Sequence, residues 1–541
     1  MGLLAAAGMA DPSELALQSA RQIAREALFR GRHSVADPAE PLATALAGTV
    51  IPGGGGSTVG WRLCRSSQEL AGTLEQGGSL GIALAPLSPL RFRQSFRDSL
   101  KTTSFSLSLV VWARQVSAAA EVGEARLLDG LTAPTTPAEL DAFVALHGDG
   151  FVAAAEVGGE CQGVYTFYAQ SREQARAVEL GFEAGLGLGG LALSPALLET
   201  VQTVARSTGV NVGFRMQVIG TRAQPPADAD ALIPFARDFA GLPLEQPALI
   251  GVRTRGYEKV PDIGAAFRAV AANRQLFSGD GLLDGGGDDG GDGGREGLIG
   301  RREQVRNLIH QMDWVAETCR LYGVTPDPTL AVHRAAAEAD LEAIDACRAA
   351  YIASASAALE PPELPSLAAG SPELNVTLSE EITMGGNGGA PFSYSGWADA
   401  VRRRLRLVEV GLRTGSRVDQ IRLRYEGEGA GEGEPLAMEV HGGGGGSDRG
   451  SLQLGPGVTI RRLEGLSGTR VDRLLLTSSD GQRIGGGGDA GDRPVDWSAP
   501  EGCVVLGFSG RSGRELDALR TVVARFGPLI WQPLDASSTT P

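Results

Sequence analysis

The stretch GGNGGAPF, at residues 385–392, begins the part of the chain whose pattern decides its fold. Two further glycine clusters follow at residues 442–446 and 485–488, and short apolar segments lie between the clusters. Short strands separated by glycine-rich turns are typical of a β-sandwich, a β-barrel or a β-prism. We therefore expect residues 371–533 to form one all-β domain.

Five sequence motifs follow one another along this region. They read GGNGGAPF (385–392), VGLRTGSRVDQIRLRYE (410–426), HGGGGG (441–446), IRRLEGLSGTRVDRLLLTSSDG (460–481) and GFSGRSGRELDAL (507–519). In content and order they resemble the motifs of jacalin-like lectin domains. The resemblance implies a β-prism of three four-stranded sheets, with a sugar-binding site between loops at one end.

The same resemblance implies which residues bind the sugar. In the family a carboxylate closes a loop of the form G-x-x-x-D, which here reads Gly513, Arg514, Glu515, Leu516 and Asp517. Asp517 is the expected acceptor of two sugar hydroxyls, and the backbone N–H groups of residues 514–516 are the expected donors. Gly389 matches the first-loop glycine, where a side chain would block the hydroxyls. The alternative is that these loops only close the prism, with Asp517 as a stabilising cap.

The first part of the chain has a mixed pattern of helices and strands. Helical patterns cover residues 13–29, 137–146, 171–209 with a glycine-rich break at 185–190, 299–322 and 328–356. Strand patterns cover residues 104–111, 151–157, 163–170 and 210–219. The last of these is the clearest, because apolar and polar residues alternate along its whole length. We expect the second and third to be separate strands, with the break at the glycines between them.

The segment from residue 137 to 219 contains a short signature and a glycine pair. The signature reads His147-Gly148-Asp149-Gly150-Phe151, and the pair is Gly158-Gly159. In the order of its elements the segment resembles the membrane attack complex/perforin (MACPF) domain. That order is a helix, this signature, a strand with paired glycines, a helical cluster and a second amphipathic strand. Gly148 and Phe151 match two signature positions, and Gly158 and Gly159 match the bend of the family's strand. The resemblance implies a bent antiparallel sheet with flanking helical clusters.

The MACPF resemblance also implies a function. Members of that family are soluble monomers that assemble into rings on a membrane and convert their helical clusters into a transmembrane β-barrel pore. Barrel closure satisfies every backbone group, and each strand needs only alternating residues. The family's order places the two clusters near residues 83–104 and at 171–209. As an extended strand, residues 171–182 would carry charges on both faces, including the face that contacts lipid in a barrel. This favours the alternative of a soluble carbohydrate-binding lectin whose MACPF-like scaffold is inactive.

Composition and motifs exclude several other classes of protein. The formal net charge of −15 argues against a nucleic-acid partner, which needs a basic face. The five cysteines lie far apart without a C-x-x-C pair, so we expect neither a disulfide framework nor a zinc site. No hydrolase, metalloprotease or phosphate-loop motif occurs, so we expect no catalytic residue, no cofactor, no metal and no enzymatic activity. We expect the acidic, glycine-rich stretch at 279–297 to be a flexible loop.

Together these patterns predict an α+β protein with two domains. Residues 1–360 form the MACPF-like domain, 361–370 a proline-rich linker, 371–533 the jacalin-like domain and 534–541 a tail. We expect a pore-forming toxin or defence protein that binds membrane glycans, then oligomerises with its own copies in a lipid bilayer. The N-terminus lacks the basic lead-in of a signal peptide. The protein is therefore expected to be made soluble and then secreted or released to reach its target membrane.

Overall fold

The computed structural model describes twelve stretches of the chain. They are residues 12–35, 42–65, 70, 73–74, 106–169, 172–186, 193–278, 297–393, 397, 400–401, 404–427 and 436–534. The expected first helical cluster at 83–104 and nearly all of the acidic loop at 279–297 lie outside these residues. The chain divides into an N-terminal unit, residues 1–307 with 339–364, and a C-terminal unit, residues 308–338 with 365–541.

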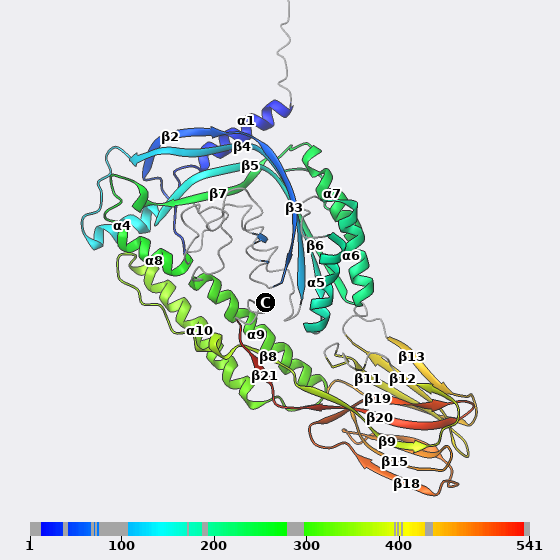
Figure 1. The fold of residues 1–541 in the computed structure, drawn as a ribbon. Coiled ribbons are helices and arrows are strands. Elements are labelled where there is room, and N and C mark those ends of the chain that lie inside the picture. Colours follow the sequence, from blue (N-terminus) through cyan, green and yellow to red (C-terminus); the bar gives the residue numbers. More distant parts are fainter. Residues whose placement is uncertain are drawn as a thin grey trace, which may run out of the picture. The chain divides into compact units, whose positions relative to one another are not determined.

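The N-terminal unit is built on one antiparallel sheet (Figure 1). Its strands are β1 (Gly31–Arg32), β2 (Leu46–Gly53), β3 (Gly56–Cys64), β4 (Leu107–Leu127), β5 (Gly150–Tyr168), β6 (Asn211–Ile219) and β7 (Ala248–Gly256). The long central strands β4 and β5 pair with each other and curve strongly. β2 and β3 follow one another along β4, while β7 and β6 follow one another along β5.

Strand β5 corrects the prediction of two separate strands at 151–157 and 163–170. The glycines between them continue the ladder, with Gly158 opposite Val116 and Gly159 opposite Gln115 of β4. A Cβ atom on Gly158 would overlap the Gln115 carbonyl oxygen, and one on Gly159 would lie 2.5 Å from a methyl group of Leu244. Only glycine fits this close approach, which lies where β6 replaces β7 as the neighbour of β5.

Helices cover the N-terminal sheet and form two cores with it. They are α1 (Pro12–Ala27), α4 (Pro137–His147), α5 (Arg172–Leu186), α6 (Pro195–Thr208), α7 (Leu232–Asp238) and α8 (Arg268–Ser278). The helices α5 and α6 pack apolar side chains against one half of the sheet, where Val178 and Val201 share a core with Phe167. The other half shares a second core with α1, α4 and α8, centred on buried aromatic rings such as Phe151 and Tyr257.

The C-terminal unit contains a prism of three four-stranded antiparallel sheets and a separate two-stranded sheet of its first and last strands. Its strands are β8 (Ser371–Glu373), β9 (Val376–Gly385), β10 (Ala390–Phe392), β11 (Arg406–Thr414), β12 (Val418–Glu426), β13 (Leu436–Gly442), β14 (Ser447–Gln453), β15 (Ile460–Ser467), β16 (Val471–Ser478), β17 (Arg483–Gly487), β18 (Arg493–Ser498), β19 (Cys503–Ser512), β20 (Leu516–Phe526) and β21 (Ile530–Gln532). The sheet orders are β10-β19-β20-β9, β13-β12-β11-β14 and β17-β16-β15-β18. Alternate apolar residues of all three sheets meet in one core, as period-2 patterns require.

Three further helices complete the chain: α9 (Leu298–Leu321), α10 (Pro328–Ala353) and α11 (Pro365–Ala369). The division between the units runs through α9 and α10, so residues 308–338 belong with the prism rather than with the N-terminal sheet. The buried Tyr322 hydroxyl donates to the carbonyl oxygen of Leu405 at 2.7 Å, and the backbone N–H of Leu529 donates to Asp327 at 3.0 Å. These contacts anchor the connection between α9 and α10 on the prism.

Candidate functional site

The predicted G-x-x-x-D loop forms the hairpin turn between β19 and β20. The backbone N–H of Gly513 donates to the carbonyl oxygen of Glu515 at 3.0 Å and closes the turn. Leu516 is fully buried and Asp517 is 6% exposed, because both already belong to β20. Arg514, at the tip, is exposed. The turn therefore presents its backbone to solvent and holds the Asp517 carboxylate at the end of the prism.

The structure brings Gly389 to this carboxylate from the opposite loop, between β9 and β10. A Cβ atom on Gly388 or on Gly389 would overlap an oxygen of Asp517, and one on Gly513 would lie 3.3 Å from it. Gly389 also has φ +63°, the left-handed conformation that glycine adopts without strain. Three glycines, Gly388, Gly389 and Gly513, thus surround the carboxylate.

Arg511 holds the glycine loop in place, and sequence reasoning did not identify it. Its Nε donates to the carbonyl oxygen of Gly388 at 2.8 Å, and its Nη2 donates to that of Gly389 at 2.7 Å. The backbone N–H of Gly386 donates to the carbonyl oxygen of Asp517 at 2.9 Å. The loop is therefore fixed by its backbone, and the Asp517 side chain is not needed to hold it.

Glu515 has an ion-pair role that the sequence did not show. Its carboxylate pairs with Arg470 and lies 3.1 Å from Nη1 of Arg417, and these arginines come from the other two sheets. Burial raises the pKa of Glu515, but hydrogen bonds and charge from Arg470 and Arg417 outweigh it, so the pKa falls below its ordinary value. Glu515 is therefore ionised at neutral pH and bridges the loops.

Asp517 has acceptor capacity left for a ligand. Its nearest cation is Arg470, whose Nε lies 3.5 Å from Oδ1. Across the parts of the chain that the structure describes, no backbone N–H donates to this carboxylate. A carboxylate with open lone pairs beside a glycine-lined space can accept hydrogen bonds from two neighbouring hydroxyl groups.

The signature residues of the N-terminal unit have structural positions. Gly148 ends α4 with φ +81°, and a Cβ atom there would overlap the backbone of Arg32. Phe151 is fully buried, with its ring centroid 5.7 Å from that of Tyr257. Both residues shape the entry into β5.

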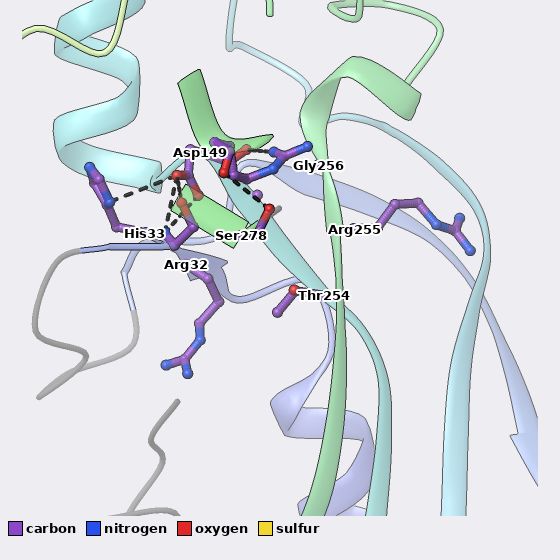
Figure 2. A pocket seen from close by; sticks show the side chains of 10 residues that line it. Arg32, His33, Asp149, Thr254, Arg255, Gly256 and Ser278 are labelled. Atoms are coloured by element: carbon purple, nitrogen blue, oxygen red, sulfur yellow. Dashed lines mark hydrogen bonds and ion pairs between the residues drawn. The ribbon is translucent and has the colours of Figure 1, made fainter. Parts of the chain in front are cut away.

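Asp149, between these two residues, is the centre of a buried polar cluster (Figure 2). Its carboxylate accepts from the N–H of Ser34 at 2.9 Å, from the Ser34 hydroxyl and from the Tyr351 hydroxyl at 2.9 Å. Nδ1 of His33 lies 3.8 Å from Oδ2, and Arg274 donates to the carbonyl oxygen of Asp149 at 2.7 Å. The sequence separations of 115 and 202 residues to Ser34 and Tyr351 explain why no local pattern shows the cluster.

The space beside this cluster is too small for a substrate. The cavity lined by Arg32, His33, Asp149 and their neighbours has a volume of about 20 Å³, which is room for one water molecule. The Ser34 hydroxyl donates to the Asp149 carboxylate and so does not form the serine–histidine pair of an activated nucleophile. The cluster therefore ties the first residues of the unit to β5 and α10.

The buried His33 predicts a pH-dependent stability. Burial lowers its pKa from 6.5, although the charge of Asp149 acts in the opposite direction. In the unfolded chain this histidine takes up a proton near pH 6.5, whereas the folded state resists protonation until a lower pH. The free energy of unfolding of the N-terminal unit therefore falls as the pH drops below 6.5.

Hydrogen exchange of the β5 amides at pH 7.5 and 5.5, corrected for intrinsic rates, measures this loss. We expect His33→Gln to reduce the pH dependence, whereas His310→Gln, at an exposed position, leaves it unchanged. An identical pH dependence in the wild type and in His33→Gln would contradict the assignment to His33.

The residues that the structure describes contain no group of three or more His, Cys, Asp or Glu side chains able to hold a metal ion. None of the five cysteines is in a disulfide bond. No helix within the described ranges is long and apolar enough to cross a membrane.

Comparison with known families identifies the C-terminal region only. Residues 382–522 match the model of the jacalin-like lectin domain, which confirms that part of the prediction. Similar solved structures include Malaysian banana lectin, at 22% identity over 28% of this chain and 99% of that one, with a TM-score of 0.23. A mannose-binding jacalin-related lectin from Ananas comosus is also 22% identical, over 27% of this chain and 96% of that one, with a TM-score of 0.23. No curated protein matches the chain, and the comparisons provide no evidence for a MACPF domain.

Proposed function

We propose that the prism binds carbohydrate through the Asp517 carboxylate and the glycine loop that faces it. The observation that carries this proposal is the open carboxylate surrounded by Gly388, Gly389 and Gly513. Because the loops are fixed by Arg511 and by the ion pairs of Glu515, the site is formed before a sugar arrives. Binding then orders few protein groups, which limits its entropic cost.

Mannose is the first sugar to test, because the relative from Ananas comosus is described as mannose-binding. The test is binding of the full chain to mannan-coated beads, with free methyl α-mannoside or free galactose as competitor. Release by the mannoside and not by galactose supports the proposal. If no glycan on a broad array binds the chain, the proposal is wrong.

A second proposed function, pore formation in a membrane, rests on the topology of the N-terminal sheet. The strands β3, β4, β5 and β6 are adjacent in this order, and each pair is antiparallel. The connections from β3 to β4 and from β5 to β6 leave the sheet at the same end, beside the Cys64–Ser108 and Tyr168–Asn211 pairs.

Unfolding of these connections would lengthen all four strands together. The second connection, residues 169–210, contains α5 and α6, and the first, residues 65–106, lies mostly outside the described residues. If both connections extended as hairpins, the inserted part of each copy would consist of strands only. In a ring of copies these strands would pair with one another, so every backbone N–H and C=O group would have a hydrogen-bond partner. Such a ring would act as a MACPF-like pore. Glycan binding by the prism would raise the concentration of the chain at the membrane.

An alternative is a lectin that binds membranes without inserting. Extended, the first turns of α5 carry Arg172, Glu173 and Arg176 on both faces of the strand. A charge on the lipid side of a barrel costs about 2–4 kcal/mol at the bilayer midplane. This cost favours the alternative unless these residues lie near the bilayer surface.

A disulfide between α5 and α6 separates the two functions. A Cβ atom on Gly181 would lie 3.6 Å from Cβ of Val204, a spacing that suits a disulfide between cysteines at both positions. Tyr168 pairs with Asn211, so in a continued hairpin Gly181 would face residue 198. In that hairpin residue 204 would lie six residues, or about 20 Å of strand, from the position opposite Gly181. A disulfide between residues 181 and 204 cannot span this distance, so it would prevent the hairpin from forming.

We expect the oxidised Gly181→Cys/Val204→Cys variant to bind vesicles that carry mannosylated lipid but release no dye. Reduction restores release to the wild-type rate, and the Gly181→Cys single variant serves as the control under both conditions. Dye release by the oxidised variant would contradict the conversion of α5 and α6. Vesicle binding by the wild type without any release would favour the non-inserting lectin.

A further inference from the structure

The two central strands of the N-terminal sheet separate at one end. β4 pairs with β5 as far as Glu121, which lies opposite Ala154. Beyond that point β4 continues beside β2, while β5 continues to Gly150 and pairs there with β7 and β1. Within the described residues, 122–127 of β4 therefore have no ladder partner on β5.

A cavity of about 640 Å³ lies where the strands separate. One wall consists of residues 47–49 of β2 and 123–126 of β4, and the other includes Phe151, Arg255 and the segment 259–261 after β7. Cavities that bind small molecules in proteins have volumes of about 300–1,000 Å³. The cavity therefore has the size of a ligand site, and all its described lining belongs to the N-terminal unit.

Backbone contacts hold the two walls in place. The N–H of Leu127 donates to Oδ2 of Asp262 at 3.3 Å and joins the walls at one end. Beside Gly48 the register of β2 against β4 shifts, and the N–H of Glu124 donates to the hydroxyl of Thr49 at 2.9 Å. Such bulges bend a strand and often lie next to binding sites. The cavity is therefore formed before a ligand arrives.

The charges of the lining favour an anion. The cations are Arg126, Arg255 and Lys259, and Glu124 is the one carboxylate among the described lining residues. Three cations against one carboxylate leave an excess of two positive charges, in a chain whose formal net charge is −15. A concave surface with one sign of charge raises the local concentration of ligands of the opposite sign.

Two of these cations can change partners at little cost. Nη2 of Arg255 lies 3.9 Å from Glu121, whereas Arg253 donates directly to that carboxylate. In Figure 2 the Arg255 side chain points away from the Asp149 cluster. Arg126 pairs with Asp129 on the surface, where an ion pair contributes little to stability. Both guanidinium groups can therefore donate to a ligand.

The uncharged part of the lining offers apolar surface. Apart from Thr49 it consists of glycines and apolar residues, among them Ala47, Ala125 and Pro261. A lining that is mostly apolar, with a few placed charges, buries the body of a ligand and fixes the orientation of its head group.

We propose that this cavity binds an amphipathic organic anion. Its carboxylate, sulfonate or phosphate group accepts hydrogen bonds from Arg255 and Lys259, and its apolar body lies against Ala47, Ala125 and Pro261. A ligand in this place contacts both walls, so it stabilises the separated end of the sheet. The site depends neither on carbohydrate binding by the prism nor on pore formation.

The test compares two fluorescent probes of matched shape on the full chain. One is 1-anilinonaphthalene-8-sulfonate, and the other is N-phenyl-1-naphthylamine, which lacks the sulfonate. We expect Lys259→Glu and Arg255→Met each to weaken binding of the sulfonate probe at least about tenfold, and to leave binding of the uncharged probe unchanged. The control Arg21→Met removes the same charge from an exposed position on α1 and leaves binding of both probes unchanged.

Hydrogen exchange locates the bound probe and guards against local unfolding. Lys259 is exposed, so we expect Lys259→Glu to keep the urea midpoint of the wild type. The sulfonate probe slows exchange of the amides at 122–127 in the wild type and not in Lys259→Glu. If both variants bind the sulfonate probe as the wild type does, or if exchange at 122–127 is unchanged, the proposal is wrong.

Two further measurements distinguish the sources of the anion. Displacement of the probe by dodecanoate supports a free amphiphile as the ligand. Flotation of the chain with phosphatidylserine vesicles, reduced by Lys259→Glu, supports a lipid headgroup. If neither occurs, the ligand class is wrong. Binding to mannan is expected to be the same in both variants and the wild type, so a failure here leaves the proposed function untouched.

Discussion

Asp517→Asn is expected to weaken the attachment of the full chain to mannan-coated surfaces at least tenfold. A hydrogen bond to a charged acceptor is worth about 1.5–3 kcal/mol, and the carboxylate is expected to accept two of them. The substitution keeps the shape of the side chain, which lies against Gly388 and Gly389, so the prism remains folded.

Surface plasmon resonance on immobilised mannan measures the effect. Asp496→Asn is the matched control, because it removes the same charge from an exposed position on β18, where Asp496 pairs with Arg462. We expect the control to bind as the wild type does. Equal binding by Asp517→Asn and the wild type would show that this loop does not bind the carbohydrate.

Arg114→Met is expected to lower the free energy of unfolding of the N-terminal unit by about 3–5 kcal/mol, the usual cost of breaking a buried ion pair from one side. Arg114 is 1% exposed, and its Nη1 lies 2.8 Å from Glu156. Its Nε lies 3.8 Å from Glu160, and the guanidinium also donates to the carbonyl oxygen of Ile250. Its loss leaves two carboxylates inside the curved sheet without this cation.

Urea unfolding followed by hydrogen exchange of the β4 and β5 amides measures the change in this unit. The control is Arg126→Met, since Arg126 and its partner Asp129 are both exposed and such pairs contribute little. The triple variant Arg114→Met/Glu156→Gln/Glu160→Gln is expected to recover part of the loss, because it also removes the two carboxylate charges that Arg114 faces. If Arg114→Met lowered the free energy of unfolding by less than 1 kcal/mol, other groups would stabilise the carboxylates of Glu156 and Glu160.

Much of the fold was predictable because its signals are local. The alternation at 210–219 predicts β6 to within one residue, and the helical patterns at 137–146 and 299–322 agree with α4 and α9 to within one residue at each end. Apolar periodicity depends only on which face of an element is buried, and the order of neighbouring residues along the chain shows that face.

The glycine pair of β5 has a role that no local pattern shows, because its close neighbours are distant in sequence. A Gly-Gly pair usually marks a turn, so the local pattern predicts two strands at 151–157 and 163–170. The meaning of Gly158 and Gly159 depends on the Gln115 carbonyl and on Leu244, which approach from other strands and loops. No window around residue 158 contains these neighbours.

For the candidate site, the sequence by itself determined the loop of residues 513–517, its Asp517 carboxylate and the facing Gly389, because these residues lie in contiguous motifs. Tertiary structure alone decided that Arg511 fixes the glycine loop and that Glu515 bridges Arg417 and Arg470. These relations join residues up to 123 positions apart across three sheets. Hydrogen bonds and ion pairs act over a few ångströms of space, so only the folded chain determines which residues are partners.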